Sequence, residues 1–176
     1  MISVEKTISV TPIYSGYVVR LEKLDVEMQN GQRSIREVVR HNGGVAIICR
    51  LPDGRYVFVR QYRKPIEQFL IEAVAGRLEQ GEDPQECAIR EIREETGYAI
   101  KSICSLGQMV PCPGYCEEVL HGFFAELEPQ AGQTDPDEDE YVETVVLSAE
   151  EIEEQIKDGR IWDGKTLGFW LKHKMH

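Results

Sequence analysis

The chain has 176 residues, enough for one domain with a real core or for one domain and a small appendage, but too few for two large domains. Apolar residues make up 41% of it and charged residues 29%, which argues against wholesale disorder. The formal net charge of -11, without basic blocks or a basic amphipathic stretch, disfavours nucleic acid and anionic membranes as partners. An anionic small molecule would need a cation as mediator.

The amino-terminal sequence has no basic start, apolar run or small-residue cleavage site, and no later segment reaches the roughly 18 apolar residues of a membrane span. We therefore expect a cytoplasmic protein. Its five cysteines favour reduced thiols over a disulfide framework. Cys112 and Cys116 have only His121 close by, which is too few ligands for a structural zinc site.

Residues 1–40 alternate apolar and polar side chains around an Asn30-Gly31 turn signal, which predicts two or three antiparallel strands. We expect this small strand-rich region to precede a main domain at 41–176. Tyr14 and Tyr17 in the lead-in would either stack on a base or fill the core, and the core is the favoured interpretation.

The main domain begins with a predicted hairpin, in which 45–51 and 56–62 flank Pro52-Asp53-Gly54 and one strand is buried on both faces. Residues 69–76 predict one further buried strand, ended by Gly76. Later strands are expected around 101–110, 118–127 and 141–147, and two final helices over 149–157 and about 165–174.

A helix is predicted to begin at about residue 84, because Asp83 stands at the N-cap, Pro84 at the first helical position and Glu86 at the third. Gly97 should end this helix, since glycine readily takes the left-handed conformation found just past a helix terminus.

This predicted helix carries an unusual density of carboxylates. Glu91, Glu94 and Glu95 are three and four residues apart, so their side chains can converge beside the helix. Hard oxygen ligands of this kind are what Mg²⁺ or Mn²⁺ selects. The alternative is an ordinary solvated face, because Arg90 and Arg93 supply charges of the opposite sign.

The spacing of fixed residues distinguishes these readings. The segment resembles the Nudix box of the Nudix hydrolase superfamily, with Tyr98 as its only departure, where an aliphatic residue is usual. Tyr98 should fill the same apolar site. The resemblance implies an α/β/α sandwich with a mixed central sheet, in which a loop–helix–loop binds divalent metal and cleaves a nucleoside diphosphate linked to another moiety. The matching positions are Gly76, Glu82, Arg90, Glu91, Ile92, Glu94, Glu95 and Gly97.

In this family the metal ligands correspond to Glu91 and Glu95, often with Glu94 and the backbone carbonyl that is here Ala75. The arginine corresponding to Arg90 orients a glutamate, here Glu82 or a neighbour. Physically, an arginine fork fixes carboxylate geometry, while the ions offset phosphate charge and activate the attacking water.

Segments outside the box resemble the ADP-ribose pyrophosphatase branch. Pro113 stands where that branch has a marker proline, although Pro113-Gly114 alone favours a plain turn. Arg63 resembles a substrate-binding arginine of the branch or forms an ordinary ion pair. Glu72 should pair with an arginine or line the cleft, because an unpaired carboxylate in a buried strand is costly. The segments are VRQYRKP, EAVAGRLEQGE, PCPGYCEE and DEDEYVETVVLS.

The branch implies a general base or water-holding glutamate in the acidic loop at 135–140, with Glu138 first and Glu140 second. It also implies a homodimer in which the amino-terminal strands of one subunit pack on the other. The implied reaction is Mg²⁺-dependent hydrolysis of ADP-ribose to AMP and ribose 5-phosphate. Two alternatives stay open, a pyrophosphatase for GDP-mannose-like nucleotide sugars and a sensor that binds ADP-ribose without cutting it.

Overall fold

The computed structural model describes residues 4–134 and 141–175. The strands are β1 Lys6–Ser15, β2 Arg20–Glu27, β3 Arg33–Arg40, β4 Gly44–Arg50, β5 Tyr56–Arg63, β6 Gln68–Glu72, β7 Val74–Arg77, β8 Tyr98–Met109, β9 Leu120–Ala131 and β10 Val142–Leu147. The helices are α1 Pro84–Thr96, α2 Ala149–Lys157 and α3 Gly164–Lys174.

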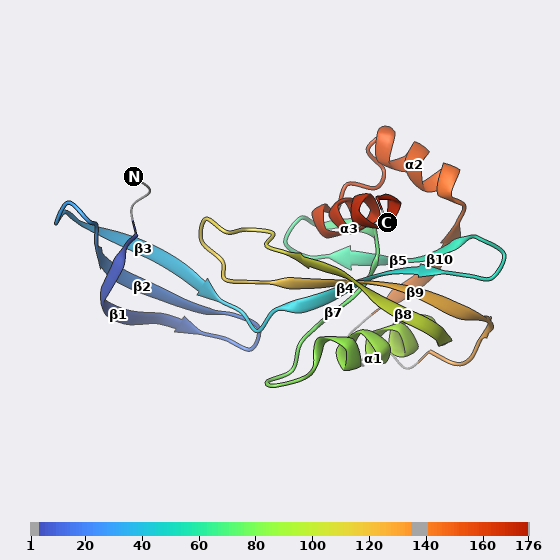
Figure 1. Cartoon of the computed structure of the whole chain (residues 1–176), viewed down its shortest axis with the longest axis horizontal. Helices are drawn as coiled ribbons and strands as arrows, with labels where there is room; N and C mark the ends of the chain where they lie inside the picture. Colours follow the sequence, from blue (N-terminus) through green and yellow to red (C-terminus); the bar gives the residue numbers. More distant parts are fainter. Residues whose placement is uncertain (1–3, 135–140, 176) are drawn as a thin grey trace.

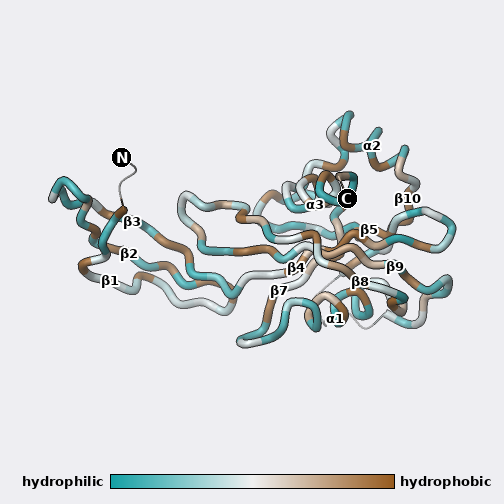
Figure 2. The backbone as a smooth tube through the Cα atoms, in the orientation of Figure 1, coloured by the Kyte–Doolittle hydropathy of each residue, from teal (hydrophilic) through white to brown (hydrophobic). Residues whose placement is uncertain are grey.

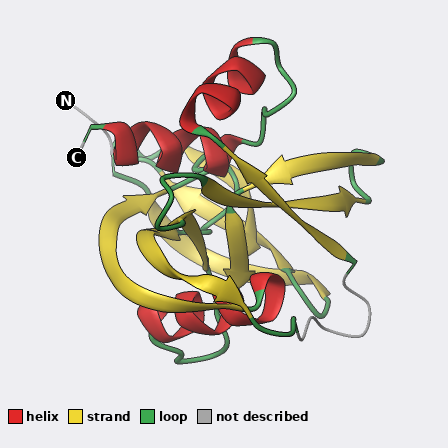
Figure 3. Ribbon diagram, turned by 90° about the vertical axis from the view of Figure 1, so that its right-hand side faces the viewer, coloured by secondary structure: helices red, strands yellow, loops and turns green. Residues whose placement is uncertain are grey.

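The main domain is built on a seven-stranded mixed sheet in the order β10-β5-β4-β9-β8, with β6 attached to β5 and β7 to β4. Helix α1 covers one face of this sheet, and α2 and α3 lie on the other (Figures 1 and 3). The expected α/β/α sandwich is therefore confirmed.

Strand β4 is central to both layers of the core. Val45, Ile47 and Cys49 belong to the cluster under α1, while Ala46 and Ile48 belong to the cluster under α2 and α3. The strand pairs in parallel with β9, whereas its other neighbours run antiparallel. Burial on both faces explains its nearly continuous apolar sequence, as predicted for a strand inside a layered sheet.

The single strand predicted at 69–76 is wrong, because the structure interrupts it at Ala73. Strand β6 pairs with β5, and β7 pairs with β4. Strands β4 and β5 pair with each other only at Cys49–Val57 and Arg50–Tyr56. Beyond these two pairs, β6 pairs with β5 and β7 pairs with β4, so the sheet opens between them. Ala73 is itself buried, and with no glycine or proline at the break, the sequence reads as one apolar run.

The first three strands form a separate antiparallel sheet, which projects away from the sandwich in Figure 1. The end of β3 joins the loop between β8 and β9: the Val39 N–H donates to the Tyr115 carbonyl at 2.7 Å, and the Glu117 N–H donates to the Val39 carbonyl at 3.1 Å. Figure 2 shows apolar segments within these strands, and none of the described helices covers them.

Tyr14 and Tyr17 do not fill a core, contrary to the favoured interpretation. Tyr14 is 59% exposed and Tyr17 is 92% exposed. A single three-stranded sheet with no layer packed on it offers no interior for rings of this size. Their apolar surface is therefore available to a ligand or to another chain.

The termini of α1 agree with the prediction. Asp83 accepts the backbone N–H groups of Gln85 and Glu86, at 2.8 and 3.2 Å, and Gly97 ends the helix with φ of 70°. Tyr98 packs against the cluster under α1, which is the place expected for an aliphatic residue. Within the described residues, no helix is long and apolar enough to cross a bilayer.

Candidate active site

The side of α1 that carries Glu91, Glu94 and Glu95 is called here the carboxylate edge. It lies directly against β7. Glu91 and Glu95 are only 8% and 4% exposed. A Cβ atom at Gly76 would overlap the carboxyl group of Glu91, so the absence of a side chain there lets this carboxylate approach the strand. The backbone N–H of Ala75 donates to Oε2 of Glu95 at 3.3 Å. Strand β7 thus contacts two of the predicted metal ligands.

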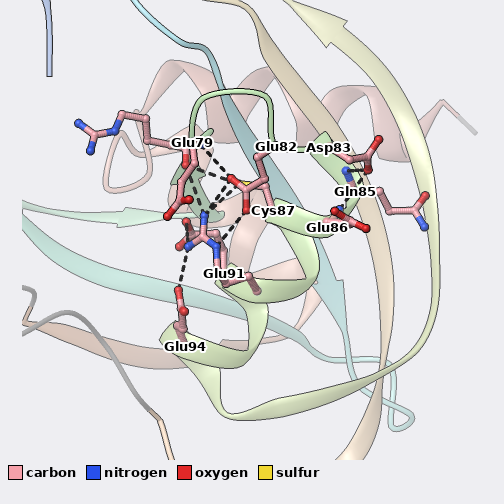
Figure 4. A network of polar contacts seen from close by, with 10 residues as sticks. Glu79, Glu82, Asp83, Gln85, Glu86, Cys87, Glu91 and Glu94 are labelled. Atoms are coloured by element: carbon pink, nitrogen blue, oxygen red, sulfur yellow. Dashed lines mark hydrogen bonds and ion pairs between the residues drawn. The ribbon is translucent and has the colours of Figure 1, made fainter.

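Arg90 is the centre of a polar network that includes Glu82, Glu91 and Glu94, which are labelled in Figure 4. Its Nε donates to Glu82 Oε1 at 3.1 Å, and its Nη1 donates to Glu91 Oε1 at 2.8 Å and to Glu94 Oε2 at 2.9 Å. The hydrogen bond from Arg90 lowers the pKa of Glu82 below its ordinary value. Arg90 thus donates hydrogen bonds to Glu82 and to two neighbouring glutamates.

The three glutamates expected to converge, Glu91, Glu94 and Glu95, each have a hydrogen-bond partner on this edge. Glu91 and Glu94 meet at Arg90, whereas Glu95 is bonded to the backbone of Ala75. Across the described ranges, no three acidic, histidine or cysteine side chains already stand grouped as a metal site.

The donor set nevertheless fits a hard divalent cation. Within the described residues, the carboxylates of Glu82, Glu91, Glu94 and Glu95 lie along this edge around Arg90, and a divalent ion would offset the repulsion among clustered carboxylates. All the side chains that would bind it are oxygen donors, and this favours Mg²⁺ or Mn²⁺ over softer metals.

A second polar cluster lies where the sheet opens. Arg63 donates to Glu72 through both Nε and Nη2 at 2.7 Å, and Lys165 also donates to Glu72 Oε2. Glu72 is completely buried. Burial raises the pKa of its carboxyl group, but the hydrogen bonds from Arg63 and the charge of Lys165 outweigh burial and lower it overall. The predicted pairing of Glu72 with an arginine is therefore observed.

Sequence reasoning missed the part of this cluster contributed by α3. Lys165 also donates to Asp163 at 3.1 Å, and Asp163 accepts the N–H of Thr166 at 3.0 Å as the N-cap of α3. The Thr166 hydroxyl accepts the N–H of Ala73 at 2.8 Å. The capping residue Asp163 was a readable signal, but no sequence pattern links it to Glu72, which lies far away along the chain.

The remaining predicted site residues lie elsewhere. Pro113 and Gly114 are exposed in the loop between β8 and β9, within a turn in which the Cys116 N–H donates to the Cys112 carbonyl at 2.9 Å. The turn interpretation of this pair thus holds. Glu138 and Glu140, the candidates for general base, lie outside the described residues.

The layered fold, together with the arginine-centred carboxylate edge beside β7, defines a Nudix hydrolase. A family model described as a NUDIX domain matches residues 40–167, and the chain belongs to the Nudix family.

Two curated relatives from Bacillus cover nearly the whole chain, and one from Yersinia covers about three quarters of it. It is 44% identical over 164 residues to a methanol dehydrogenase activator from Bacillus methanolicus, which covers 93% of this chain and 89% of the relative. It is 39% identical over 163 residues to an ADP-ribose pyrophosphatase from Bacillus subtilis (strain 168), and the match covers 92% of this chain and 88% of that relative. A GDP-mannose pyrophosphatase from Yersinia enterocolitica is 38% identical over 144 residues, and the match covers 77% of this chain and 75% of that relative.

A solved structure of an ADP compounds hydrolase superposes with a TM-score of 0.83, covering 97% of this chain and 92% of the other. The two sequences are only 20% identical, so this likeness shows the fold.

Proposed function

We propose that the protein hydrolyses the pyrophosphate bond of ADP-ribose to AMP and ribose 5-phosphate, with Mg²⁺ or Mn²⁺ as cofactor. The arginine-centred carboxylate edge beside β7 carries this proposal. The 39% identity to an ADP-ribose pyrophosphatase over most of both chains supports the choice of substrate.

Glu91, Glu95 and the carbonyl of Ala75 would hold the metal, with Glu94 assisting. A bound divalent ion offsets phosphate charge and lowers the pKa of coordinated water. Arg90 keeps Glu91 and Glu94 in place before substrate arrives. Glu138, or else Glu140, would accept the proton of the attacking water, because a carboxylate can act as a base toward water whose pKa a cation has lowered.

Arg63 would bind the phosphates of the substrate, together with the turn at Pro113-Gly114. The Arg63 side chain is 38% exposed although it pairs with buried Glu72, so it is accessible from solvent. Tyr17 is a candidate for stacking on the base: its exposed ring lies 4.8 Å from the guanidinium carbon of Arg77, which directly follows Gly76. Aromatic faces bind any base by stacking, which leaves the identity of the base open.

The substrate preference can be measured with a panel of ADP-ribose, GDP-mannose, NADH and diadenosine compounds in the presence of Mg²⁺. The proposal predicts the highest kcat/KM for ADP-ribose. A preference for GDP-mannose would support the alternative suggested by the Yersinia relative. Tight binding of ADP-ribose without turnover would instead indicate a sensor, although the box retains all its glutamates.

A second candidate function, stimulation of an alcohol dehydrogenase, is favoured by the 44% identity to a methanol dehydrogenase activator. This stimulation could depend on hydrolysis by the same Nudix-box residues. Adding wild-type protein or Glu91→Gln to a purified methanol dehydrogenase separates the two functions. Stimulation lost with the variant would tie this function to hydrolysis, whereas stimulation retained would indicate a binding role.

A homodimer formed through residues 1–40 and a cytoplasmic location stay predictions. All ten residues of β1 are exposed, which favours a second chain as their cover. The five cysteines are free, as expected for thiols in a reducing compartment.

A further inference from the structure

We infer that Lys165 of α3 is a positioning residue that orients Arg63 toward the substrate through Glu72. This inference rests on the proposed function, in which Arg63 binds the phosphates. It goes beyond that function because it assigns a role to a helix outside the Nudix box.

The argument begins with the donors of Arg63. Its Nε and Nη2 are both committed to Glu72, whereas among the described residues its Nη1 donates to no protein group. A guanidinium is planar, so fixing the edge formed by Nε and Nη2 also fixes the direction in which Nη1 points. The orientation of the Glu72 carboxylate therefore determines how Arg63 presents its remaining donor.

Arg63 alone cannot fix that carboxylate, because the two groups could rotate together as a pair. Lys165 adds a third hydrogen bond to Glu72, on the oxygen that also accepts from Arg63 Nη2. The Lys165 side chain is only 15% exposed and also binds Asp163. The Glu72 carboxylate is thus bonded to α3 through Lys165 as well as to β5 through Arg63.

Asp163, which also binds Lys165, is itself held in place at the start of α3. Asp163 caps α3 and accepts from the Thr166 hydroxyl at 2.6 Å, and that hydroxyl accepts the N–H of Ala73. Ala73 stands at the break between β6 and β7, two residues before Ala75. The cap of α3 therefore fixes both the phosphate-binding arginine and the strand that contacts the predicted metal ligands.

The activity test compares wild-type protein, Lys165→Met and Lys172→Met with ADP-ribose and Mg²⁺. Lys172 is the matched control: it is a half-buried lysine of α3 that donates to the Leu106 and Gln108 carbonyls, away from Glu72. We expect Lys165→Met to raise KM about tenfold with little change in kcat, as for loss of an interaction made equally in the ground and transition states. Lys172→Met should leave both constants unchanged.

A double-mutant cycle shows whether Lys165 acts through Arg63. In an Arg63→Ala background, Lys165→Met should change KM less than about twofold, because the group it positions is gone. An unchanged KM for Lys165→Met, or an equal effect in both backgrounds, would overturn the inference. Should Lys165→Met fail to fold, Lys165→Gln replaces it in each experiment, since its shorter neutral side chain also removes the charge pair with Glu72.

A readout without substrate keeps this inference separable from the proposed function. The side-chain Nε–Hε signal of Arg63, assigned by its disappearance in Arg63→Ala, reports how well its hydrogen bond to Glu72 is held. Hydrogen exchange at this site should be at least about fivefold faster in Lys165→Met than in wild-type protein or Lys172→Met. Unchanged exchange would refute the positioning role, whereas a wild-type protein inert toward ADP-ribose would refute only the proposed function.

Discussion

The carboxyl group of Glu91 occupies the space that a side chain at Gly76 would fill. The glycine of the strand and the glutamate of the helix are therefore one structural unit: the missing Cβ allows a nearly buried carboxylate to lie against the backbone of β7. This explains in steric terms why the box begins with glycine fifteen residues before its first metal-binding glutamate.

Gly76→Ala should displace the Glu91 carboxylate. Overpacking of this kind typically costs about 1 to 3 kcal/mol, and here the flexible end of a side chain can yield, so we expect a loss near the lower limit. Turnover should fall at least about tenfold, because a ligand moved by even an ångström binds metal poorly. Denaturant unfolding and kcat/KM for ADP-ribose measure the two effects. Gly164→Ala is the control, since its added Cβ meets open space; equal losses in both variants would contradict the steric explanation.

Glu91→Gln should abolish most of the metal affinity with little change in fold. The amide keeps the size of the carboxylate but removes its charge, so calorimetry should show Mg²⁺ or Mn²⁺ binding weakened at least about tenfold, and kcat should fall about a hundredfold or more. Glu86→Gln, on the exposed side of the same helix, should behave as wild type. Unchanged metal binding and turnover in Glu91→Gln would refute the assigned role.

Glu72→Gln should destabilise the protein in a pH-dependent way. It removes the charge partner of Arg63 and Lys165, and breaking a buried pair in this way costs roughly 3 to 5 kcal/mol at pH 7. The pKa of Glu72 is lower in the folded protein than the value of about 4.3 for an unfolded chain. Its stabilising contribution is thus present above pH 4.3 and is lost as the pH falls through the folded pKa.

Denaturant unfolding of wild-type protein and Glu72→Gln from pH 7 to 3 tests this linkage. The difference between the two should stay constant down to about pH 5 and shrink below about pH 4. Glu153→Gln, which breaks the exposed ion pair with Lys174, should show a difference of less than about 1 kcal/mol throughout. If the difference in unfolding free energy between wild-type protein and Glu72→Gln grew at low pH, it would contradict a lowered pKa of Glu72 in the folded protein.

Val10→Glu should weaken the predicted dimer. Val10 is 47% exposed on β1, in a sheet that no other layer covers. A charge buried at an apolar interface is costly, so light scattering coupled to gel filtration should show a dimer for wild-type protein and a shift toward monomer for the variant. Thr11→Glu, one residue along and on the opposite face of the strand, is the control. A monomeric wild-type protein would contradict the dimer.

The fold and the box could be predicted because their signals are local. Asp83, Pro84 and Gly97 define α1 through capping chemistry, and the fixed spacing of the glutamates defines the box. The break at Ala73 could not be predicted, since it depends on which strands the two halves pair with. Lys165 was missed for a related reason: its contact with Glu72 spans 93 positions of sequence and exists only once α3 packs beside the opened sheet.

The exposure of Tyr14 and Tyr17 has a different origin. Their apolar character favoured burial in a core, but within the described residues both rings are exposed on a single-layered sheet. Composition and periodicity do not say whether the cover is a core, a ligand or another subunit.

Hydrolysis of ADP-ribose in ¹⁸O-labelled water with Mg²⁺ tests the central claim most directly. Water adds across the pyrophosphate bond, so the products should be AMP and ribose 5-phosphate, with one ¹⁸O atom in the phosphate of one of them, and Glu91→Gln should form both at least about a hundredfold more slowly. Mass spectrometry identifies the products and the labelled phosphate. Formation of ADP and ribose, which requires cleavage of the ribosyl–phosphate linkage instead, or no product at all, would contradict the account.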